Sequence, residues 1–144
     1  MSEVRLFDGV HSLLQLSSSL APPLVAQVRV VFSFYETKNN PLPPSLRAPL
    51  LYIEFFEVFS DPDDITKMYK LRRKVALGPD GSPYRDAAVI PITTVTHAVE
   101  LIPIYGHRHD RQATVNVSLE KYNEFYLNNY SDKEWYHTIS QDYL

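Results

Sequence analysis

The chain has 144 residues, of which 44% are hydrophobic and 12% aromatic, a size and composition typical of one globular domain and not of a disordered chain. Its formal net charge is −3 and its pI is about 5.9, which excludes a uniformly basic surface for nucleic acid and leaves only a local patch for such contacts. There is no cysteine, and this excludes disulfides, thiolate zinc sites and cysteine nucleophiles together.

Residues 1–24 are predicted to form an N-terminal extension whose structure the sequence leaves open. Gly9 and a serine cluster weaken a helical spacing that relates Val4, Phe7, Val10 and Leu14. Polar residues interrupt the leucines that follow, and no run approaches the ~20 apolar residues of a membrane span. We therefore expect neither a signal peptide nor a membrane-spanning segment.

From residue 25 onward, apolar residues recur at every second position, which is typical of half-buried strands. In the first predicted strand, Ala26–Tyr35, Gln27 and Arg29 fall on the polar face, and the inward face carries Val28, Val30, Phe32 and Phe34. The second predicted strand is Leu50–Phe59. A β-bulge near residues 55–56 of this strand would bring Glu54 and Glu57 to one wet face.

Three further strands complete the predicted sheet. Lys67–Leu77 is expected to pair with the second strand and to place Arg72 opposite Glu54, with an apolar face made of Tyr69, Leu71, Val75 and Leu77. A strong turn signal follows at Gly78–Gly81. The last two strands, Ala87–Ile92 and His97–Tyr105, contain Pro91 and Pro103, so each is predicted to lie at an edge or a bulge.

The C-terminal part is predicted to be helical over residues 118–140. Ser118 is the expected cap of a helix that carries Leu119, Tyr122, Tyr126 and Leu127. Ser131 and Glu134 have the spacing of a capping box that opens a second helix. The predicted fold class is therefore mainly β (α+β): one domain over residues 25–144, built as a small curved sheet or SH3/BAH-like barrel of about five strands with two short C-terminal helices.

Two stretches of the chain resemble a known family. The first is VIPITTVTHAVELIPIYG at Val89–Gly106, preceded by AQVRVVFSF and LLYIEFFEV, and the second is SLEKYNEFYLNNYSDKEWYHTI at Ser118–Ile139. Over residues 25–140 this series resembles the C-terminal β-rich region of uncharacterised fungal proteins encoded by Plavaka-type and related KDZ-type DNA transposons.

The resemblance implies that the catalytic RNase-H-like core of such proteins lies upstream, so that this chain corresponds to the tail alone or to a short gene remnant. None of the family's catalytic motif matches here, so no catalytic residue is implied. The expected partners are other domains of a transposase polyprotein, and the expected location is intracellular and nuclear.

A basic stretch at Lys67–Lys74 is the best local candidate for binding nucleic acid. Alternate basic side chains of a strand project on one side about 7 Å apart, close to the phosphate spacing of a nucleic-acid strand. The candidate DNA-binding residues are Lys67, Lys70, Arg72, Arg73 and Lys74, extended by Arg85, Arg108 and Arg111. The alternative is a solvated strand face with cross-strand ion pairs.

Aromatic residues offer two further candidate surfaces. Tyr122, Tyr126, Trp135 and Tyr136 form either a helical pair packed on the sheet or an exposed interaction surface. The other set could form a chromatin-reader-like cage for a methylated lysine, although core packing is the simpler interpretation; it comprises Tyr52, Phe55, Phe56, Tyr69 and Tyr84.

No catalytic motif, cofactor motif or metal site emerges from the sequence. The chain has only four glycines and no phosphate-cradling loop, and the aspartates at 61–64 fit turn chemistry better than a calcium loop. We therefore expect a non-enzymatic accessory module of a transposon-derived protein that binds DNA weakly through the basic strand. The alternative is a protein-interaction module that docks on a transposase core through sheet edges and the aromatic C-terminal segment.

Overall fold

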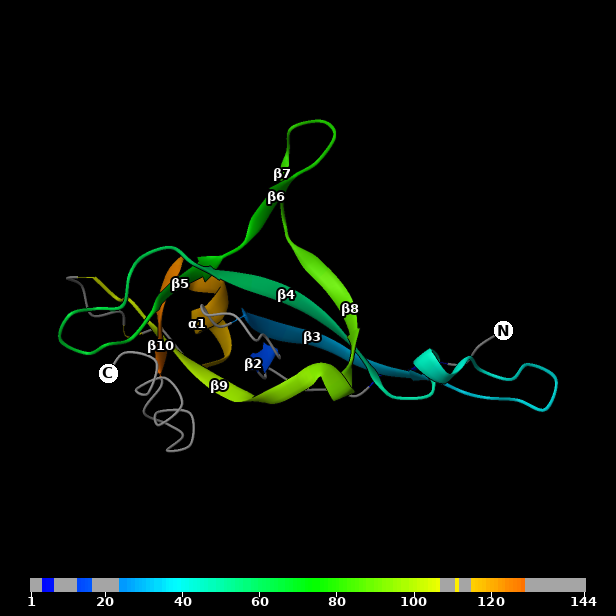
Figure 1. Cartoon of the computed structure of the whole chain (residues 1–144). Helices are drawn as coiled ribbons and strands as arrows, with labels where there is room; N and C mark the ends of the chain where they lie inside the picture. Colours follow the sequence, from blue (N-terminus) through cyan, green and yellow to red (C-terminus); the bar gives the residue numbers. More distant parts are fainter. Residues whose placement is uncertain (1–3, 7–12, 17–23, 107–110, 112–114, 129–144) are drawn as a thin grey trace. The chain divides into compact units, whose positions relative to one another are not determined.

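The computed structural model describes residues 4–6, 13–16, 24–106, 111 and 115–128, and within these ranges it is mainly β with one short α-helix (Figure 1). The chain divides into two compact units. Unit 1 comprises Met1–Phe56 and Lys74–Ala98, and unit 2 comprises Glu57–Arg73 and Val99–Leu144.

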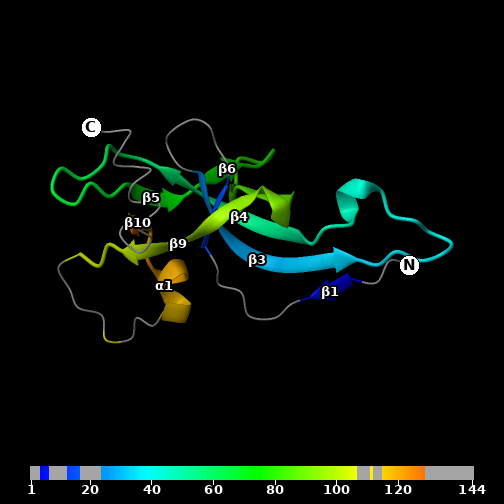
Figure 2. The same cartoon turned by 60° about the horizontal axis from the view of Figure 1, so that its bottom comes forward.

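The sheet of unit 1 is organised around the long strand β3 (Leu24–Phe34). β1 (Val4–Leu6) and β2 (Leu13–Leu16) pair with β3 at its two ends, and β4 (Leu50–Val58) pairs with it over most of its length. β8 (Ala87–Pro91) in turn pairs with β4. All these pairings are antiparallel, and the long strands curve along their length (Figure 2). The predicted mainly β class with a small curved sheet is confirmed.

The N-terminal extension contributes two strands, β1 and β2. The helical spacing of its apolar residues therefore does not correspond to a helix at these positions. Val4 and Leu6 lie opposite Phe34 and Phe32, and β2 is in register with residues 24–27. Pairing with a long neighbouring strand supplies the backbone hydrogen bonds that a weak local pattern cannot predict.

A β-bulge in β3 determines which of its side chains reach the core. The register with β4 passes from Val28↔Ile53 to Val30↔Tyr52, so Arg29 is the extra residue. The predicted bulge at residues 55–56 is therefore wrong, and after Arg29 it is Val31, rather than Val30, that packs against the core. The buried cluster of unit 1 consists of Ala26, Val28, Leu51 and Ile53.

Gln27 also departs from its predicted place on the polar face, because only 1% of it is exposed. This part of β3 has paired strands along both edges, β2 on one side and β4 on the other. Residues Val25–Val28 are all buried, and since successive side chains point to opposite faces, both faces of the strand are covered here.

The predicted third strand, Lys67–Leu77, is divided in two at Lys74. β5 (Lys70–Arg73) belongs to unit 2, whereas β6 (Val75–Leu77) forms a hairpin with β7 (Pro83–Arg85) in unit 1. The Lys74 N–H donates to the Phe55 carbonyl, and the Lys74 carbonyl accepts from the Asp86 N–H, both at 2.9 Å. The backbone thus changes its pairing partner at this residue, which ends one strand and begins the next.

The turn predicted at Gly78–Gly81 is confirmed as the tip of this hairpin. Gly81 has φ +79°, a left-handed conformation that favours glycine, and its N–H donates to the Gly78 carbonyl. The Asp80 carboxylate accepts bonds from the hydroxyl and the N–H of Ser82, and these bonds lower the pKa of Asp80.

Unit 2 contains the sheet β9–β10–β5 and one helix. β9 (Val95–Pro103) begins in unit 1, and its residues 100–103 pair with β10 (Glu124–Asn128), which pairs with β5 on its other edge. Helix α1 spans Val115–Lys121. No helix within the described ranges is long and apolar enough to cross a membrane.

The C-terminal segment corrects the predicted helix at 118–127. The helix ends at Lys121, Ser118 lies inside it instead of capping it, and residues 124–128 form a strand. Phe125 and Leu127 are fully buried while Glu124 is exposed, the alternation that a strand produces. The second predicted helix, which opens at Ser131, lies outside the described residues.

The loop between β4 and β5 is organised by Asp63. Its carboxylate accepts hydrogen bonds from the Thr66 N–H at 2.8 Å, the Thr66 hydroxyl at 3.0 Å and the Ile65 N–H at 3.0 Å. These bonds, led by the one from the Thr66 backbone, lower the pKa of Asp63 below its ordinary value of 3.8. Asp63 therefore serves turn chemistry, as predicted for this stretch.

We expect Asp63→Ala to destabilise the protein at about pH 7 relative to Asp64→Ala, its exposed neighbour. Because the folded-state pKa is depressed, the contribution of Asp63 is complete above pH 3.8 and is lost as the pH falls through the lower folded-state value. Urea unfolding at neutral and acidic pH should show the difference between the two variants shrinking on acidification. Equal stabilities at neutral pH would contradict this role.

Candidate interaction surfaces

The basic side chains that the sequence assigns to β5 lie next to acidic and aromatic groups of unit 2. Arg72 Nε lies 2.7 Å from Glu57 Oε1, and its guanidinium lies 5.4 Å from the centre of the Phe59 ring. Glu124 is directly opposite Arg72 on β10. The ammonium of Lys70 lies 5.7 Å from the centre of the Tyr126 ring on the same neighbouring strand.

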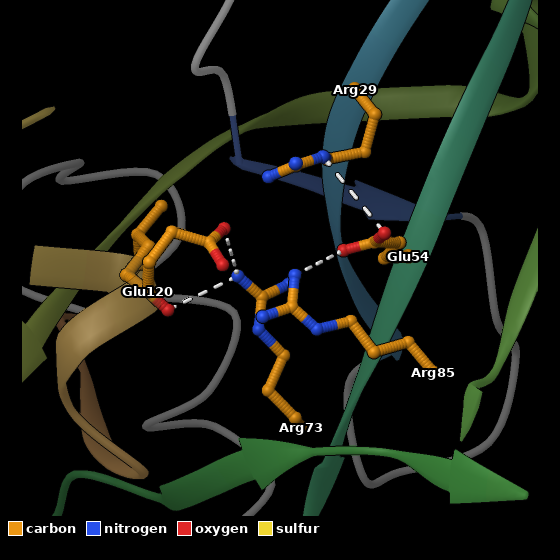
Figure 3. A network of polar contacts seen from close by, with 6 residues as sticks. Arg29, Glu54, Arg73, Arg85 and Glu120 are labelled. Atoms are coloured by element: carbon orange, nitrogen blue, oxygen red, sulfur yellow. Dashed lines mark hydrogen bonds and ion pairs between the residues drawn. The ribbon is translucent and has the colours of Figure 1, made fainter. Parts of the chain in front are cut away.

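Arg73 is a structural residue of unit 2. Only 11% of its side chain is exposed, and its Nη2 donates to the Leu119 carbonyl at 3.1 Å and to Glu120 Oε1 at 3.2 Å (Figure 3). A cation at the last turn of a helix satisfies carbonyls that have no partner within the helix. Arg73 therefore joins β5 to α1 and does not belong to an exposed patch.

The carboxylate of Glu54 lies between two arginines in unit 1. Its oxygens lie 3.0 Å from Arg85 Nη1 and 3.9 Å from Arg29 Nε, and only 12% of the side chain is exposed (Figure 3). The bulge residue Arg29 and Arg85 on β7 thus converge on the middle of β4. The predicted pairing of Glu54 with Arg72 is wrong, since Glu54 lies opposite Gln27 and Ala87.

Lys74, in unit 1, also lies next to an acidic and an aromatic side chain. Its ammonium lies 3.0 Å from Asp86 Oδ2 and 5.8 Å from the centre of the Phe55 ring. Lys67 is exposed and has φ 58°, in the turn before β5, and Arg111 is exposed. Arg108 lies outside the described residues.

The candidate DNA-binding set is therefore largely engaged within the protein. Four of its members, Arg72, Arg73, Lys74 and Arg85, each have a carboxylate within 3.2 Å. A phosphate would have to compete with these carboxylates. The more exposed pairs, Arg72–Glu57 and Lys74–Asp86, contribute only about 0–1 kcal/mol each to stability, whereas the pairs of Arg73 and Arg85 each include a side chain that is largely buried. This arrangement is the alternative that the sequence left open, a strand face with cross-strand ion pairs.

An apolar surface that the sequence did not predict lies on the β6–β7 hairpin. Val75 and Tyr84 are each 53% exposed and Leu77 is 71% exposed. The register Ala76↔Tyr84 places Tyr84 on one face of the hairpin and the two aliphatic residues on the other. The hairpin extends beyond β4 and β8 within unit 1 (Figure 1). The period of two assigned Val75 and Leu77 inward, but it cannot tell whether anything covers that face.

The aromatic surface predicted for the C-terminal segment is only partly described. The Tyr122 ring packs edge-to-face on Tyr105, with 5.0 Å between ring centres, and both Tyr122 and Tyr126 are half-buried. These two tyrosines therefore pack within the protein, as one of the two interpretations expects, and do not form a fully exposed surface. Trp135 and Tyr136 lie outside the described residues.

The aromatic-cage residues divide into buried and exposed ones. Phe56 and Tyr69 are only 2% and 6% exposed, as expected of core packing, whereas Tyr52 and Tyr84 are 38% and 53% exposed. Within the described part of the chain there is no group of three or more histidine, aspartate or glutamate side chains that could hold a metal ion.

Comparisons with models of protein families, with curated proteins and with solved structures find no protein similar to this chain.

Proposed function

We propose that the chain is a non-enzymatic protein-interaction module that docks a partner on the apolar side chains of the β6–β7 hairpin. The observation that carries this proposal is the exposure of Val75 and Leu77 on one face of the projecting hairpin, with Tyr84 exposed on the opposite face. A two-stranded hairpin is marginally stable alone in water, and clustered exposed apolar side chains are typical of surfaces that a partner covers. The resemblance to transposon-encoded proteins suggests another domain of such a polyprotein as the partner.

The charge distribution favours a protein over DNA. The carboxylates beside Arg72, Lys74 and Arg85 weaken the local positive potential that phosphate binding requires. The hairpin strands themselves carry a single charged side chain, Arg85, which is paired with Glu54. An uncharged apolar contact surface fits this hairpin best.

Weak DNA binding through β5 is the second candidate function. One observation favours it: Lys70 lies beside the Tyr126 ring on the β5–β10 pair. A cation next to an aromatic ring is the combination with which many proteins hold single-stranded nucleic acid.

The test compares the full chain with the double variant Val75→Thr/Leu77→Thr, which has a β-branched residue at both strand positions but removes apolar surface. Ile65→Thr is the matched control, because Ile65 is 91% exposed but lies in the Asp63 loop. Each protein is immobilised and treated with nuclease at high salt. We expect the wild-type chain and the Ile65→Thr control to retain the same protein partner. The double variant should lose this partner.

Fluorescence anisotropy with single-stranded and duplex DNA separates the second candidate from the first. Affinity that falls steeply with salt and is lost in Lys70→Glu would favour DNA binding. That result, together with partner retention that disappears after nuclease treatment, would overturn the proposed function.

A further inference from the structure

Ser82 is an exposed residue at the tip of the β6–β7 hairpin, in the loop that joins the two strands (Figure 1). Its hydroxyl donates to Asp80 Oδ1 at 2.6 Å, and its N–H donates to the same oxygen at 3.0 Å. Its carbonyl accepts a hydrogen bond from the Gly78 N–H at 2.9 Å. Ser82 therefore helps to close the turn, and two of these three bonds go to one carboxylate oxygen.

The residues after Ser82 distinguish it from every other serine and threonine of the chain. Pro83 follows it directly and Arg85 follows three positions later, whereas no other serine or threonine precedes a proline. Proline has no backbone N–H, so a kinase cleft without an acceptor for the residue after the hydroxyl favours proline at that position. A basic residue three positions after the hydroxyl adds an ion pair to such recognition. Arg85 lies 3.0 Å from Glu54 in the closed hairpin, so Pro83, which is exposed, is the recognition element that the fold presents.

The tip of the hairpin opens at low cost, which a kinase requires of its acceptor segment. β6 and β7 pair over three residues each, and a two-stranded hairpin is only marginally stable in water. Beyond the strands, the tip is held by the Gly81 N–H bond to the Gly78 carbonyl and by the bonds of Ser82. Local opening of these bonds leaves Ser82 and Pro83 in an extended segment that a kinase cleft can bind.

The sequence of the tip offers no cation to a phosphate on Ser82. From residue 75 to residue 84 it contains one charged residue, Asp80. The Ser82 hydroxyl, and after it the Ser82 N–H, lowers the pKa of Asp80 below its ordinary value of 3.8, so this carboxylate is ionised at neutral pH. The basic residues on either side of the tip, Lys74 and Arg85, each lie 3.0 Å from a carboxylate of their own. A phosphate with a charge of about −1.5 to −2 would therefore stand beside a negatively charged side chain.

We propose that a proline-directed protein kinase phosphorylates Ser82 and that the phosphate opens the tip of the β6–β7 hairpin. In the transfer, Ser82 Oγ attacks the γ-phosphorus of a Mg²⁺-bound nucleoside triphosphate that the kinase supplies, and an oxygen–phosphorus bond forms. The bond from this phosphorus to the β,γ-bridging oxygen breaks, so the nucleoside diphosphate leaves. The hydroxyl proton passes to the catalytic aspartate of the kinase. The chain itself contributes the acceptor hydroxyl and the proline that marks it.

The phosphate acts on the tip through Asp80. Phosphorylation removes the hydroxyl hydrogen that Ser82 donates at 2.6 Å, and it places a second anion next to the carboxylate. Both changes favour the open tip, in which the two negative groups lie further apart. The effect on docking rests on the proposed function: a partner that covers Val75 and Leu77 binds the closed hairpin, so the phosphate lowers its affinity. The kinase acts on the chain before the partner docks.

The first test is phosphorylation of the full chain by a purified cyclin-dependent kinase with Mg²⁺ and ATP, followed by mass spectrometry. We expect one phosphate on Ser82 and none on Ser45, which is also exposed but precedes Leu46 instead of a proline. Ser82→Ala should take up no phosphate, whereas the matched control Ser45→Ala should take it up at the wild-type rate. Pro83→Ala keeps the hydroxyl and should be phosphorylated at least about tenfold more slowly.

Hydrogen exchange gives the second test, because it reports the opening of the tip directly. We expect the amide hydrogens of Gly78 and Gly81 to exchange at least about fivefold faster after phosphorylation, while that of Asp86 is unchanged. Asp80→Asn keeps an acceptor for the Ser82 N–H but removes the negative charge, so phosphorylation should accelerate the same two amides less in this variant. The unphosphorylated Ser82→Ala chain measures the loss of the hydroxyl bond alone.

The inference is overturned if Ser82 takes up no phosphate or if Pro83→Ala is phosphorylated as fast as the wild type. It is also overturned if phosphorylation leaves the exchange of the two glycine amides unchanged, or accelerates it equally in Asp80→Asn. These results do not depend on a partner. With the partner present, the phosphorylated wild type should lose it and kinase-treated Ser82→Ala should retain it; retention by both would reject the effect on docking. Failure of the Val75→Thr/Leu77→Thr variant to lose the partner would instead reject the proposed function and leave the kinase and exchange results unchanged.

Discussion

Phe125→Ala is expected to lower the free energy of unfolding by about 3–5 kcal/mol. Phe125 is fully buried in unit 2, between β9 and β5, where it lies opposite Pro103 on one side and Leu71 on the other. Removing the ring leaves a cavity that neighbours paired on both edges can fill only partly. Urea unfolding monitored by circular dichroism measures the loss.

Tyr126→Ala is the matched control for this prediction. A strand over residues 124–128 makes Phe125 costly and Tyr126 less so, because Tyr126 is only half-buried. A helix through the same residues, with Tyr122 and Tyr126 facing the sheet, would reverse that order. A greater loss for Tyr126→Ala than for Phe125→Ala would therefore contradict the strand.

Ile53→Ala is expected to cost about 2–5 kcal/mol. Ile53 is fully buried in the cluster of unit 1, next to Ala26, Val28 and Leu51. The cluster lies on β3 and β4, which pair with each other and hold each other's backbone in place, so it can collapse only slightly around the lost atoms.

Tyr52→Ala tests the facing of the same strand. Tyr52 precedes Ile53 on β4 and is 38% exposed, so its truncation should cost clearly less although the side chain is larger. Both variants are compared by urea midpoint and slope, since a changed slope would indicate an altered unfolded or native state. Equal losses would show that β4 is buried on both faces at this point.

Much of the sheet could be predicted, because apolar residues recur at every second position where one face of a strand is buried. Leu51 and Ile53 follow it, and β3, β4, β8 and β9 lie close to their predicted bounds. The pattern fails at Arg29, where a bulge inserts one residue and reverses the facing of those that follow. A bulge of this kind depends on the partner strand, which the local sequence does not identify.

The two larger errors share one cause. Val75 and Leu77 continue the alternation of Tyr69 and Leu71, but the backbone exchanges one neighbour for another at Lys74. At residues 124–128 the local sequence suits a helix or a strand, and pairing with β5 and β9 decides between them. Tertiary pairing overrides local preference in both places.

The basic residues could be located from the sequence, but their partners could not. Which carboxylate faces which arginine depends on the register between the strands. The predicted register was wrong, so it paired Glu54 with Arg72, whereas the structure pairs Glu54 with Arg29 and Arg85. The apolar hairpin could not be predicted either, since its exposure follows from what the rest of the fold leaves uncovered.

The junction at Phe55, Lys74 and Asp86 has a consequence for how the protein opens. Three chain segments meet there through three backbone hydrogen bonds, so the hairpin beyond it can fray without disturbing the sheet behind it. Amide hydrogens on the tip side, such as that of Ala76, are then expected to exchange with solvent through local opening of the hairpin. The amide hydrogen of Asp86 is expected to exchange more slowly, because its exchange requires opening of the junction with the sheet. The junction thus separates a hairpin that can open locally from a sheet that opens only with the rest of unit 1.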